Sequence, residues 1–435
     1  MRIAWFTPFG SRSAIGQFSA EVVSSLAANA DIDIWTDDAV PVDSGVPVVN
    51  YSNAAVDISK LNRYDVVVYN FGNYLPYHKA IYEISKRRRG IVILHDRVMH
   101  HFFAGYCFDI QQDPNAYLVM MEQHYGSEGY RRARISLGGG APRIWEDDTK
   151  VVRYPLFEEC AINAEGVIVH AEGHAQTVRN RYCGPVRTLH LPAYSANRGF
   201  GLERHSEAKV GDRLTLLTIG HGNRNKRIHD VIRVLGEDET LAKQCRYIVI
   251  GPIESCYRVE LEELIDKYSL HGTVCLIGFQ TDEVLSKHLA MSDIFINLRL
   301  PSMEGGSASL MLEMAYGKPV VCYDAGFFGE LPAATVARVD PFAPNALHAA
   351  IDGLVSSPEL RAQIGAEARA FAVRWDEKSY AQEFLSFVEE VKLWRPALTQ
   401  ADTVAGQIRW MGFSKQKGLC THMAEEIWGL FSPIE

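Results

Sequence analysis

Short apolar segments alternate with amphipathic ones along most of this chain, and this alternation constrains the fold more than any other feature. In the first half, strands are predicted over residues 2–7, 32–36, 65–70, 90–94, 166–170 and 186–191. Their content of Val, Ile and Tyr is typical of parallel strands that are buried on both faces. Helices fill the intervals, such as residues 17–29, where apolar side chains recur every three to four positions. The pattern predicts an α/β fold with a doubly wound parallel sheet.

The same alternation starts again after a polar stretch rich in Gly and Ser over residues 191–212. Strands are predicted over 214–219, 247–251, 274–277, 293–297 and 320–323, and helices over 227–235, 257–268, 283–291 and 307–316. A chain of 435 residues also exceeds the roughly 250–300 residues that one core supports. We therefore predict two Rossmann-like domains, over residues 1–195 and 212–375.

Composition narrows the range of partners and compartments. The net charge of −9, from 44 Lys and Arg against 53 Asp and Glu, argues against non-specific nucleic-acid binding. The eight cysteines show no metal-type spacing, which is typical of free thiols in a reducing compartment. The first residues resemble a strand rather than a signal peptide, and no stretch reaches the roughly 18 apolar residues of a membrane span. We expect a cytoplasmic protein.

Residues 293–330 carry the most informative motif. A predicted strand leads into a loop with Glu304, Gly305 and Gly306, and a helix follows from Ser307. A glycine-rich loop that leads into a helix N-terminus presents free N–H groups and the positive end of the helix dipole, which together bind phosphate. Carboxylates beside a phosphate site are unfavourable unless they accept hydrogen bonds from sugar hydroxyls. Together with Glu313, the motif predicts a nucleotide-sugar site.

The segment LEMAYGKPVV around Glu313 resembles the signature of family-4 retaining glycosyltransferases of the GT-B fold. In that family a first Glu contacts the donor sugar and a second Glu holds the nucleotide ribose. Glu313 matches the second position. The family separates its two glutamates by eight positions, whereas Glu304 precedes Glu313 by nine. Either the loop has one extra residue and Glu304 still reaches the sugar, or another group has taken that role.

The resemblance implies two domains facing each other across a cleft, with a helix over 376–395 that crosses back to the first domain. It places Gly16 in a loop facing the donor, although Gly16 as the permissive residue of a tight turn is an equal alternative. Lys226, six positions after Gly220, matches the family's diphosphate-binding lysine. His221 stands where the family has Arg, so Arg224 is a candidate substitute. The alternative is a solvated turn.

Three further residues are candidates for donor binding. The family places the turn containing Phe279 and Gln280 against the nucleotide base, while core packing is the alternative for Phe279. Arg299 follows a strand into the cleft, where it could bind phosphate or pair with Glu304. We expect no metal and no cofactor, because fixed cations and helix N–H groups can stabilise a leaving diphosphate.

The stretch of residues 95–101 contains His95, Asp96, His100 and His101 just after a predicted strand. These residues could bind a metal, or His95 and Asp96 could shape the donor or acceptor pocket as catalytic groups. The third alternative is a helix cap by Asp96 with structural imidazoles. Together with residues 71–78 and 125–129, the stretch resembles a bacterial subgroup that builds surface polysaccharides. An insertion over residues 111–154 is either an acceptor-handling segment or a surface cover.

The resulting prediction is a retaining enzyme that moves a hexose-type sugar from a nucleoside-diphosphate sugar to a glycan or lipid-linked saccharide. Two alternatives stay open: a nucleotide-sugar 2-epimerase, and an inactive nucleotide-sugar-binding subunit of a polysaccharide assembly complex. The tail over residues 396–435 mixes aromatic and basic side chains. It could dock on the core, on a partner or on a membrane surface at the inner face of the membrane.

Overall fold

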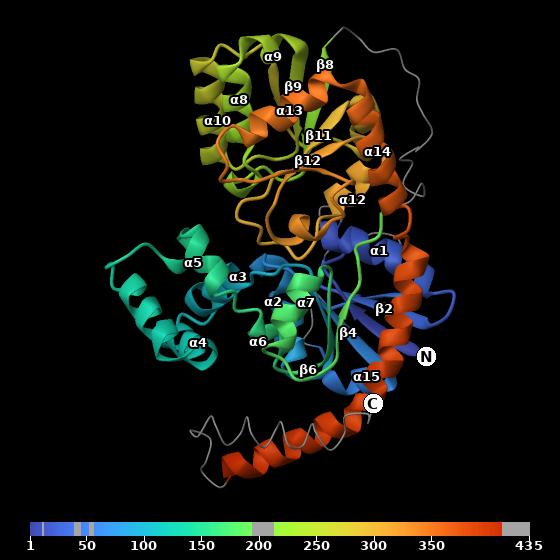
Figure 1. Ribbon diagram of the computed structural model, residues 1–435. Helices are drawn as coiled ribbons and strands as arrows, with labels where there is room; N and C mark the ends of the chain where they lie inside the picture. Colours follow the sequence, from blue (N-terminus) through green and yellow to red (C-terminus); the bar gives the residue numbers. More distant parts are fainter. Residues whose placement is uncertain (11–12, 39–44, 52–55, 194–212, 411–435) are drawn as a thin grey trace.

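The computed structural model describes residues 1–10, 13–38, 45–51, 56–193 and 213–410 as two parallel β-sheets flanked by helices (Figure 1). The first sheet contains β1 (Arg2–Phe6), β2 (Asp31–Thr36), β3 (Val48–Asn50), β4 (Val66–Phe71), β5 (Gly90–Leu94), β6 (Ala164–Val169) and β7 (Val186–Thr188). The second contains β8 (Leu214–Ile219), β9 (Cys245–Ile250), β10 (Val274–Ile277), β11 (Ile294–Ile296), β12 (Val320–Tyr323) and β13 (Ala337–Val339). The predicted pair of Rossmann-like domains is therefore confirmed.

The order of strands fixes where each sheet can bind a ligand. The sheets run β3-β2-β1-β4-β5-β6-β7 and β10-β9-β8-β11-β12-β13, with every pair parallel. In each sheet the direction of strand addition reverses, between β1 and β4 and between β8 and β11. The loops after these strands diverge at the carboxyl ends, which is where open α/β sheets bind ligands.

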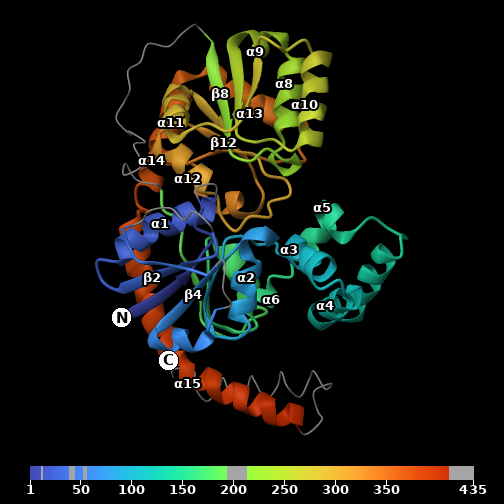
Figure 2. The ribbon, with the colours of Figure 1, turned by 180° about the vertical axis from the view of Figure 1, so that it is seen from behind.

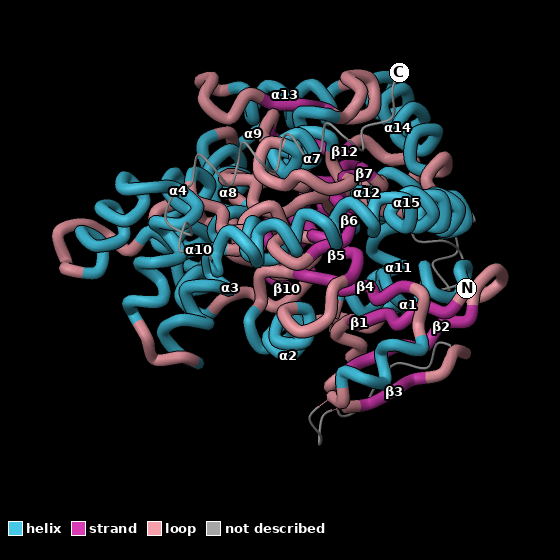
Figure 3. Tube along the Cα trace, turned by 90° about the horizontal axis from the view of Figure 1, so that it is seen from below, coloured by secondary structure: helices cyan, strands magenta, loops and turns pink. Residues whose placement is uncertain are grey.

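Helices cover both faces of each sheet. In the first half they are α1 (Ala14–Leu26), α2 (Leu75–Ser85), α3 (His100–Gly105), α4 (Pro114–Leu137), α5 (Asp148–Arg153), α6 (Glu158–Ala161) and α7 (Glu172–Arg179). In the second half they are α8 (Ile228–Glu237), α9 (Glu239–Gln244), α10 (Ser255–Lys267), α11 (Asp282–Met291), α12 (Ala308–Ala315), α13 (Ala346–Ser356), α14 (Pro358–Ala372) and α15 (Glu377–Trp410). In the view of Figure 3, strands β4 and β5 of the first sheet lie between α2 and α15.

One hydrophobic core runs through both domains. It joins Trp5 and Phe18 of the first domain to Phe295 and Leu310 of the second, and it includes one face of α15. The helix α15 leaves the second domain, packs on α1 and continues along the first domain (Figures 1 and 2). Its side chains Phe384, Phe387, Val388 and Val391 are fully buried. The predicted crossing helix is present, and it extends through Pro396 to Trp410.

Residues 111–154, predicted as an insertion, contain α4 and α5, which project from the first domain as an arm together with the preceding α3 (Figure 1). Gly126 interrupts α4 with a φ of 67°, so that a kink divides α4 into two helical segments. The arm packs onto the first domain, because Tyr117 and Met121 are fully buried in a hydrophobic cluster that also contains Tyr82 and Phe102.

Element boundaries differ from the predictions where local capping decides them. The helix predicted from residue 17 begins at Ala14, because the Ser13 side chain accepts a hydrogen bond from the Gly16 N–H. The short strand β3 was not predicted from the sequence. Among the described residues, no helix has the length and the apolar character needed to cross a membrane. Most of the predicted linker, and the tail after Trp410, lie outside the described residues.

Candidate active site

A buried lysine lies at the carboxyl end of β8. The strand is followed by Gly220, whose φ of 95° turns the chain toward the 3₁₀ turn Arg224–Lys226. The turn brings the Lys226 ammonium back beneath the strand, where it donates to the Ile219 carbonyl. A Cβ at Gly220 would lie 2.7 Å from that ammonium, so glycine leaves it room. Burial, and then the neighbouring Arg299, lower the pKa of Lys226 well below its ordinary value.

The loop after β11 supplies a second buried cation and a carboxylate. Arg299 is only 6% exposed and donates through Nη1 to the Leu298 carbonyl at 2.8 Å. Its Nε also donates to Oε1 of Glu304 at 3.2 Å. This resolves one open question from the sequence, because Arg299 pairs with Glu304 and still lines the cleft.

The N-terminus of α12 faces the same hollow. Ser307 caps the helix by accepting a hydrogen bond from the Leu310 N–H at 3.2 Å. The N–H groups of Ala308 and Ser309 precede the first hydrogen bond inside the helix, which Met311 makes to the Ser307 carbonyl. These groups border a hollow of about 290 Å³ that Lys226 and Arg299 also line. Two cations and a helix N-terminus around one hollow form a site for an anion. We call this space the anion hollow.

Glu313 lies behind this hollow and is fully buried. Its Oε2 accepts a hydrogen bond from Asn297 Nδ2 at 2.8 Å, while Oε1 has no partner. Asn297 Nδ2 also donates to Ser309 Oγ at 3.0 Å, so Glu313 and Ser309 share this amide. Burial raises the pKa of Glu313 to about 7, against the lowering effects of Asn297 and Lys226.

A second hollow of about 440 Å³ lies between the two domains. Its lining includes Ile15, Phe18, Asn73, Tyr77, His95 and Asp96 from the first domain and Glu304, Gly306 and Ala308 from the second. The last three residues also line the anion hollow, so the two hollows adjoin. Glu304 therefore stands at their junction, which places a carboxylate beside both.

Asp96 faces Glu304 across the domain boundary. The two residues form an antiparallel backbone bridge, and Asp96 Oδ2 accepts the Asn73 N–H at 2.6 Å. Burial raises the pKa of Asp96 to about 7, and the nearby Glu304 adds to the rise while the Asn73 hydrogen bond opposes it. The predicted helix cap is wrong, since α3 begins four residues later, at His100, and Asp96 caps no helix.

Backbone hydrogen bonds hold the domains together at this point. The Gly305 N–H donates to the His95 carbonyl at 2.9 Å. The N–H groups of Arg97 and Val98 donate to the Met303 carbonyl at 2.9 and 3.1 Å. The Gly305 amide is thus engaged by the opposite domain, so only Gly306 and Ser307 remain of the three amides predicted for phosphate binding.

Four other predicted donor residues lie away from the hollows. Arg224 is exposed and pairs with Glu260 at 2.6 Å. Phe279, at the turn with Gln280, is 70% exposed, so the alternative of core packing is wrong. Gly16 is the third residue of α1, and a Cβ there would lie 2.5 Å from the Pro8 carbonyl oxygen. Close packing of α1 on this loop, rather than a tight turn, requires glycine at this position.

The histidines of residues 95–101 are engaged inside the first domain. His100 contacts the Tyr154 carbonyl and the Tyr117 hydroxyl, and His101 contacts the Trp145 carbonyl. Both ring nitrogens of His95 are also occupied, by Asn70 and His170. Within the described part of the chain, no group of three or more His, Cys, Asp or Glu could hold a metal ion. His95 therefore offers the cleft no free ring nitrogen.

Several lining residues were not predicted from the sequence. Phe327 and Phe328 border the anion hollow, and Asn73 holds Asp96. Glu330 accepts hydrogen bonds from the first domain, through the N–H groups of Glu172 at 2.7 Å and Gly173 at 2.9 Å. Phe327, Phe328 and Glu330 lie within the stretch 293–330, and Asn73 lies within the stretch 71–78, but no individual role was predicted for any of them. The position of Asn73 after a strand was the one usable signal.

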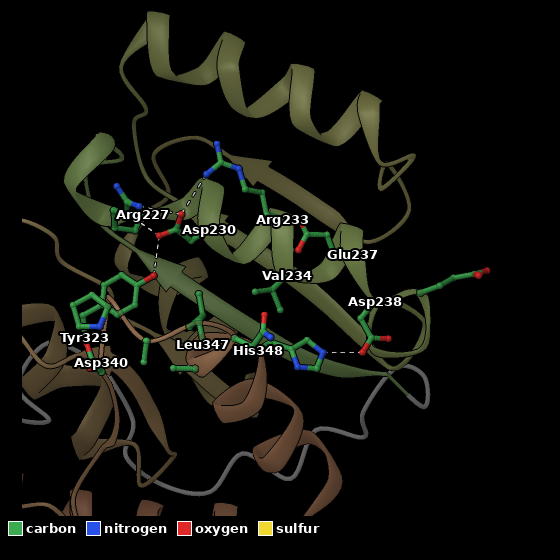
Figure 4. A pocket seen from close by; sticks show the side chains of 15 residues that line it. Arg227, Asp230, Arg233, Val234, Glu237, Asp238, Tyr323, Asp340, Leu347 and His348 are labelled. Carbon is green, nitrogen blue, oxygen red and sulfur yellow. Dashed lines mark hydrogen bonds and ion pairs between the residues drawn. The ribbon is translucent and has the colours of Figure 1, made fainter.

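A further hollow of about 640 Å³ lies in the second domain between α8 and the loop before α13 (Figure 4). Several of its polar groups are paired with one another. Asp230 accepts from Arg227 and Tyr323, and His348 contacts Asp238 at 2.9 Å. The donor-binding candidates of the sequence do not line this hollow, which makes the cleft between the domains the candidate active site.

A comparison with protein families gives a match in the second domain. Residues 200–371, somewhat less than half of the chain, match the family model described as "Glycosyl transferases group 1". The match spans Lys226, Arg299, Glu304 and Glu313, the residues that surround the anion hollow. A search of the curated proteins finds no match to the chain.

Solved structures share the whole architecture. Sucrose-phosphate synthase from Thermosynechococcus elongatus has 14% identity and a TM-score of 0.61, covering 90% of this chain and 99% of its own. HepE from Anabaena, in complex with UDP and glucose, has 15% identity and a TM-score of 0.60, covering 90% and 100%. WaaG, described as a glycosyltransferase involved in lipopolysaccharide biosynthesis, has 13% identity and a TM-score of 0.57, covering 89% and 99%. At these identities the likeness shows the fold, which is GT-B. The fold and the family match together support a glycosyltransferase.

Proposed function

We propose that this chain is a retaining glycosyltransferase that moves a hexose-type sugar from a nucleoside-diphosphate sugar to a glycan or lipid-linked saccharide in polysaccharide synthesis. One observation carries the proposal. Two buried cations, Lys226 and Arg299, meet the N-terminus of α12 at a hollow that adjoins an interdomain hollow lined by Asp96 and Glu304. The first hollow suits a diphosphate and the second suits a sugar.

The donor diphosphate is assigned to Lys226, Arg299 and the first turn of α12. Lys226 spends one of its three N–H donors on the Ile219 carbonyl, which leaves two for phosphate oxygens. Isolated buried cations are unfavourable, and a bound dianion offsets that cost. Arg299 takes the role that the sequence suggested for Arg224, because Arg224 is drawn to Glu260 at the surface.

The sugar is assigned to the junction of the hollows, where Glu304 and Asp96 can accept hydrogen bonds from its hydroxyls. The extra residue in the loop still leaves Glu304 in this position, since the Glu304 side chain lines both hollows. The ribose is assigned to Glu313, whose Oε1 lacks a partner, together with Ser309. A ribose reaches Glu313 only if the cleft opens, because the side chain is fully buried.

The residues support a front-face reaction without a side-chain nucleophile. The bond between the anomeric carbon and the phosphate oxygen breaks, and the charge that grows on the leaving diphosphate is stabilised by Lys226, Arg299 and the α12 N–H groups. The acceptor hydroxyl forms its bond on the same face of the sugar. Its proton passes to a leaving phosphate oxygen, so the anomeric configuration is retained.

Nucleotide binding tests the donor site. We would titrate UDP, GDP and ADP into the wild type and into the Lys226→Ala and Arg299→Ala variants by calorimetry, starting with UDP because the HepE structure contains it. Loss of one charged hydrogen-bond donor should weaken binding about ten- to a hundred-fold. The Arg224→Ala variant is the matched control and should bind as the wild type does. No binding by the wild type across the panel would overturn the proposal.

The stereochemistry of transfer tests the reaction class. With the nucleotide sugar that binds, NMR of the product's anomeric proton should show the configuration of the donor. An inverted product would refute the retaining mechanism. Nucleotide binding without any transfer to saccharide acceptors would favour the alternative of a binding subunit, and isomerised donor without an acceptor would favour an epimerase.

A further inference from the structure

Four polar groups form a row behind the interdomain hollow, and none of them has a role in the proposed reaction. The Leu189 carbonyl oxygen lies 2.9 Å from His170 Nδ1, and His170 Nε2 lies 3.1 Å from His95 Nδ1. His95 Nε2 lies 3.0 Å from Asn70 Oδ1. His170 is 1% exposed, and Asn70 is fully buried. His170 and Asn70 are therefore shielded from bulk water and must make their hydrogen bonds within the protein, whereas His95 is partly exposed where it lines the interdomain hollow.

Both ends of the row accept hydrogen bonds. The Leu189 carbonyl can only accept, so His170 Nδ1 carries a hydrogen. The Asn70 amide is oriented by its own nitrogen, which donates to the Phe6 carbonyl at 2.9 Å. Its oxygen therefore faces His95, so His95 Nε2 also carries a hydrogen. These assignments follow from the hydrogen-bond network.

Two neutral imidazoles hold two protons, and the ends of the row use both. The central nitrogens, His95 Nδ1 and His170 Nε2, would then face each other at 3.1 Å with two lone pairs. A third proton between them would complete the row and give the pair one positive charge. Burial opposes this charge, since it lowers the pKa of His170 to about 4 and that of His95 well below its ordinary value.

The charges around the two histidines decide whether the third proton binds despite the burial of the pair. The titratable groups that face it from the surrounding segments are Asp96, Glu304, His78, His174, His190 and Tyr380. Only Asp96 and Glu304 are carboxyl groups, and burial keeps Asp96 partly protonated near neutral pH. An anion entering the adjoining hollow would add the negative charge that the pair lacks.

We propose that His95 and His170 act as one proton-binding unit that takes up a third proton from solvent when an anionic donor occupies the cleft. The proton joins His95 Nδ1 to His170 Nε2, and no other bond forms or breaks. His170 is the positioning residue, because it holds the His95 ring against the cleft wall through this bond. The charged pair then stabilises the leaving diphosphate. This inference rests on the proposed function, because the anion that triggers proton uptake is the nucleoside-diphosphate sugar.

The test observes the ring nitrogens directly. The protein would be labelled with ¹⁵N-histidine, and ¹⁵N spectra would be recorded near neutral pH without and with saturating UDP. The signals of His95 and His170 would be identified by their absence in the His95→Gln and His170→Gln variants. We expect one protonated nitrogen on each ring in the free protein. With UDP, the two rings should become a pair that shares an imidazolium charge.

The His170→Gln variant makes the test specific. A glutamine amide supplies its own N–H to His95 Nδ1, so the row is complete without a third proton. Calorimetry in buffers of different ionisation enthalpy should show about one proton fewer taken up per UDP bound than in the wild type. The variant His348→Gln, outside the cleft, should match the wild type. Circular dichroism would verify that both variants fold.

Two results would overturn the inference. UDP could bind while the wild-type rings stay neutral, or His170→Gln could take up as many protons as the wild type. Failure of the proposed function gives a different result, namely no UDP binding by the wild type, and the inference would then fall with its anion.

Discussion

At the scale of single residues, the least usual group is the carboxyl of Glu313. It is fully buried, it has one unpartnered oxygen, and burial raises its pKa to about 7 from an ordinary 4.5. Between these two values the folded state binds more protons at Glu313 than the unfolded state does. The free energy of unfolding must therefore decrease as the pH rises from about 4.5 to about 7.

The substitution Glu313→Gln should remove this dependence, because an amide stays neutral. Relative to the wild type, the variant should gain up to about 3 kcal/mol of unfolding free energy between pH 4.5 and pH 8. Urea unfolding at several pH values measures the difference. Glu283→Gln is the control, because Glu283 is exposed and pairs with Lys287. Parallel curves for the wild type and Glu313→Gln would contradict the prediction.

The positions of the three predicted cations, Lys226, Arg299 and Arg224, show how far a sequence predicts where a side chain will lie. Lys226 and Arg299 lie in the loops that follow strands β8 and β11, and both residues line the cleft. Arg224 lies in the same turn as Lys226, yet its side chain is exposed and pairs with Glu260 on α10. Position after a strand predicts which residues reach the cleft edge. It does not predict which carboxylate a flexible side chain will find.

At the scale of elements, Glu330 links the two domains by capping a helix of the other domain. Its carboxylate accepts the N–H groups of Glu172 and Gly173, which begin α7. A Cβ at Gly173 would lie 2.6 Å from Glu330 Oε1, so a larger residue there would displace the end of the Glu330 side chain. The 3₁₀ turn that ends at Glu330 includes Phe327 and Phe328, which line the anion hollow. The cleft wall and the domain contact therefore share one turn.

We expect Glu330→Ala to favour an open cleft. Loss of two capping hydrogen bonds should cost about 1 kcal/mol, or about five-fold in the ratio of closed to open molecules. Small-angle X-ray scattering should show a larger radius of gyration, and nucleotide affinity should decrease by a similar factor. Glu359→Ala, on the outer helix α14, is the control. An unchanged radius and affinity would show that this cap does not influence closure.

Elements differ in how far local sequence determines them. Strands with several Val and Ile residues, such as β4, β5 and β9, were predicted with their main residues correct. The strand β3 has three residues and pairs only with β2, at the sheet edge. So short a segment carries too little pattern to be recognised, and its pairing partner decides that it is a strand.

At the scale of the whole molecule, α15 is the element that unites the domains. It follows α14 of the second domain and packs against α1 of the first. Phe384 is fully buried on it, with its ring centroid 5.4 Å from that of Trp5. Leu393 on the same helix is 83% exposed. This pair of residues allows the contribution of the crossing helix to be measured.

Phe384→Ala should lower the free energy of unfolding by about 3–5 kcal/mol, the usual cost of removing a buried Phe side chain. Because the core that contains Phe384 extends into both domains, the variant should also unfold over a broader range of urea. Leu393→Ala should change the free energy by less than about 0.5 kcal/mol. Urea titrations followed by tryptophan fluorescence compare the two. Equal losses would mean that α15 contributes little to stability.

The sequence alone predicted the two parallel sheets and the edge of each sheet where a ligand site would form. Strand composition, helix spacing and glycine loops are local properties, and parallel sheets place their carboxyl-end loops together in every such fold. Tertiary structure alone decided the long-range contacts: Asp96 with Glu304 and Glu330 with α7 across the domains, and His95 with His170 within the first domain. These pairs are separated by 75 or more residues and carry no local pattern. Only the packing of one domain on the other, and of strand on strand, brings their atoms within hydrogen-bonding distance.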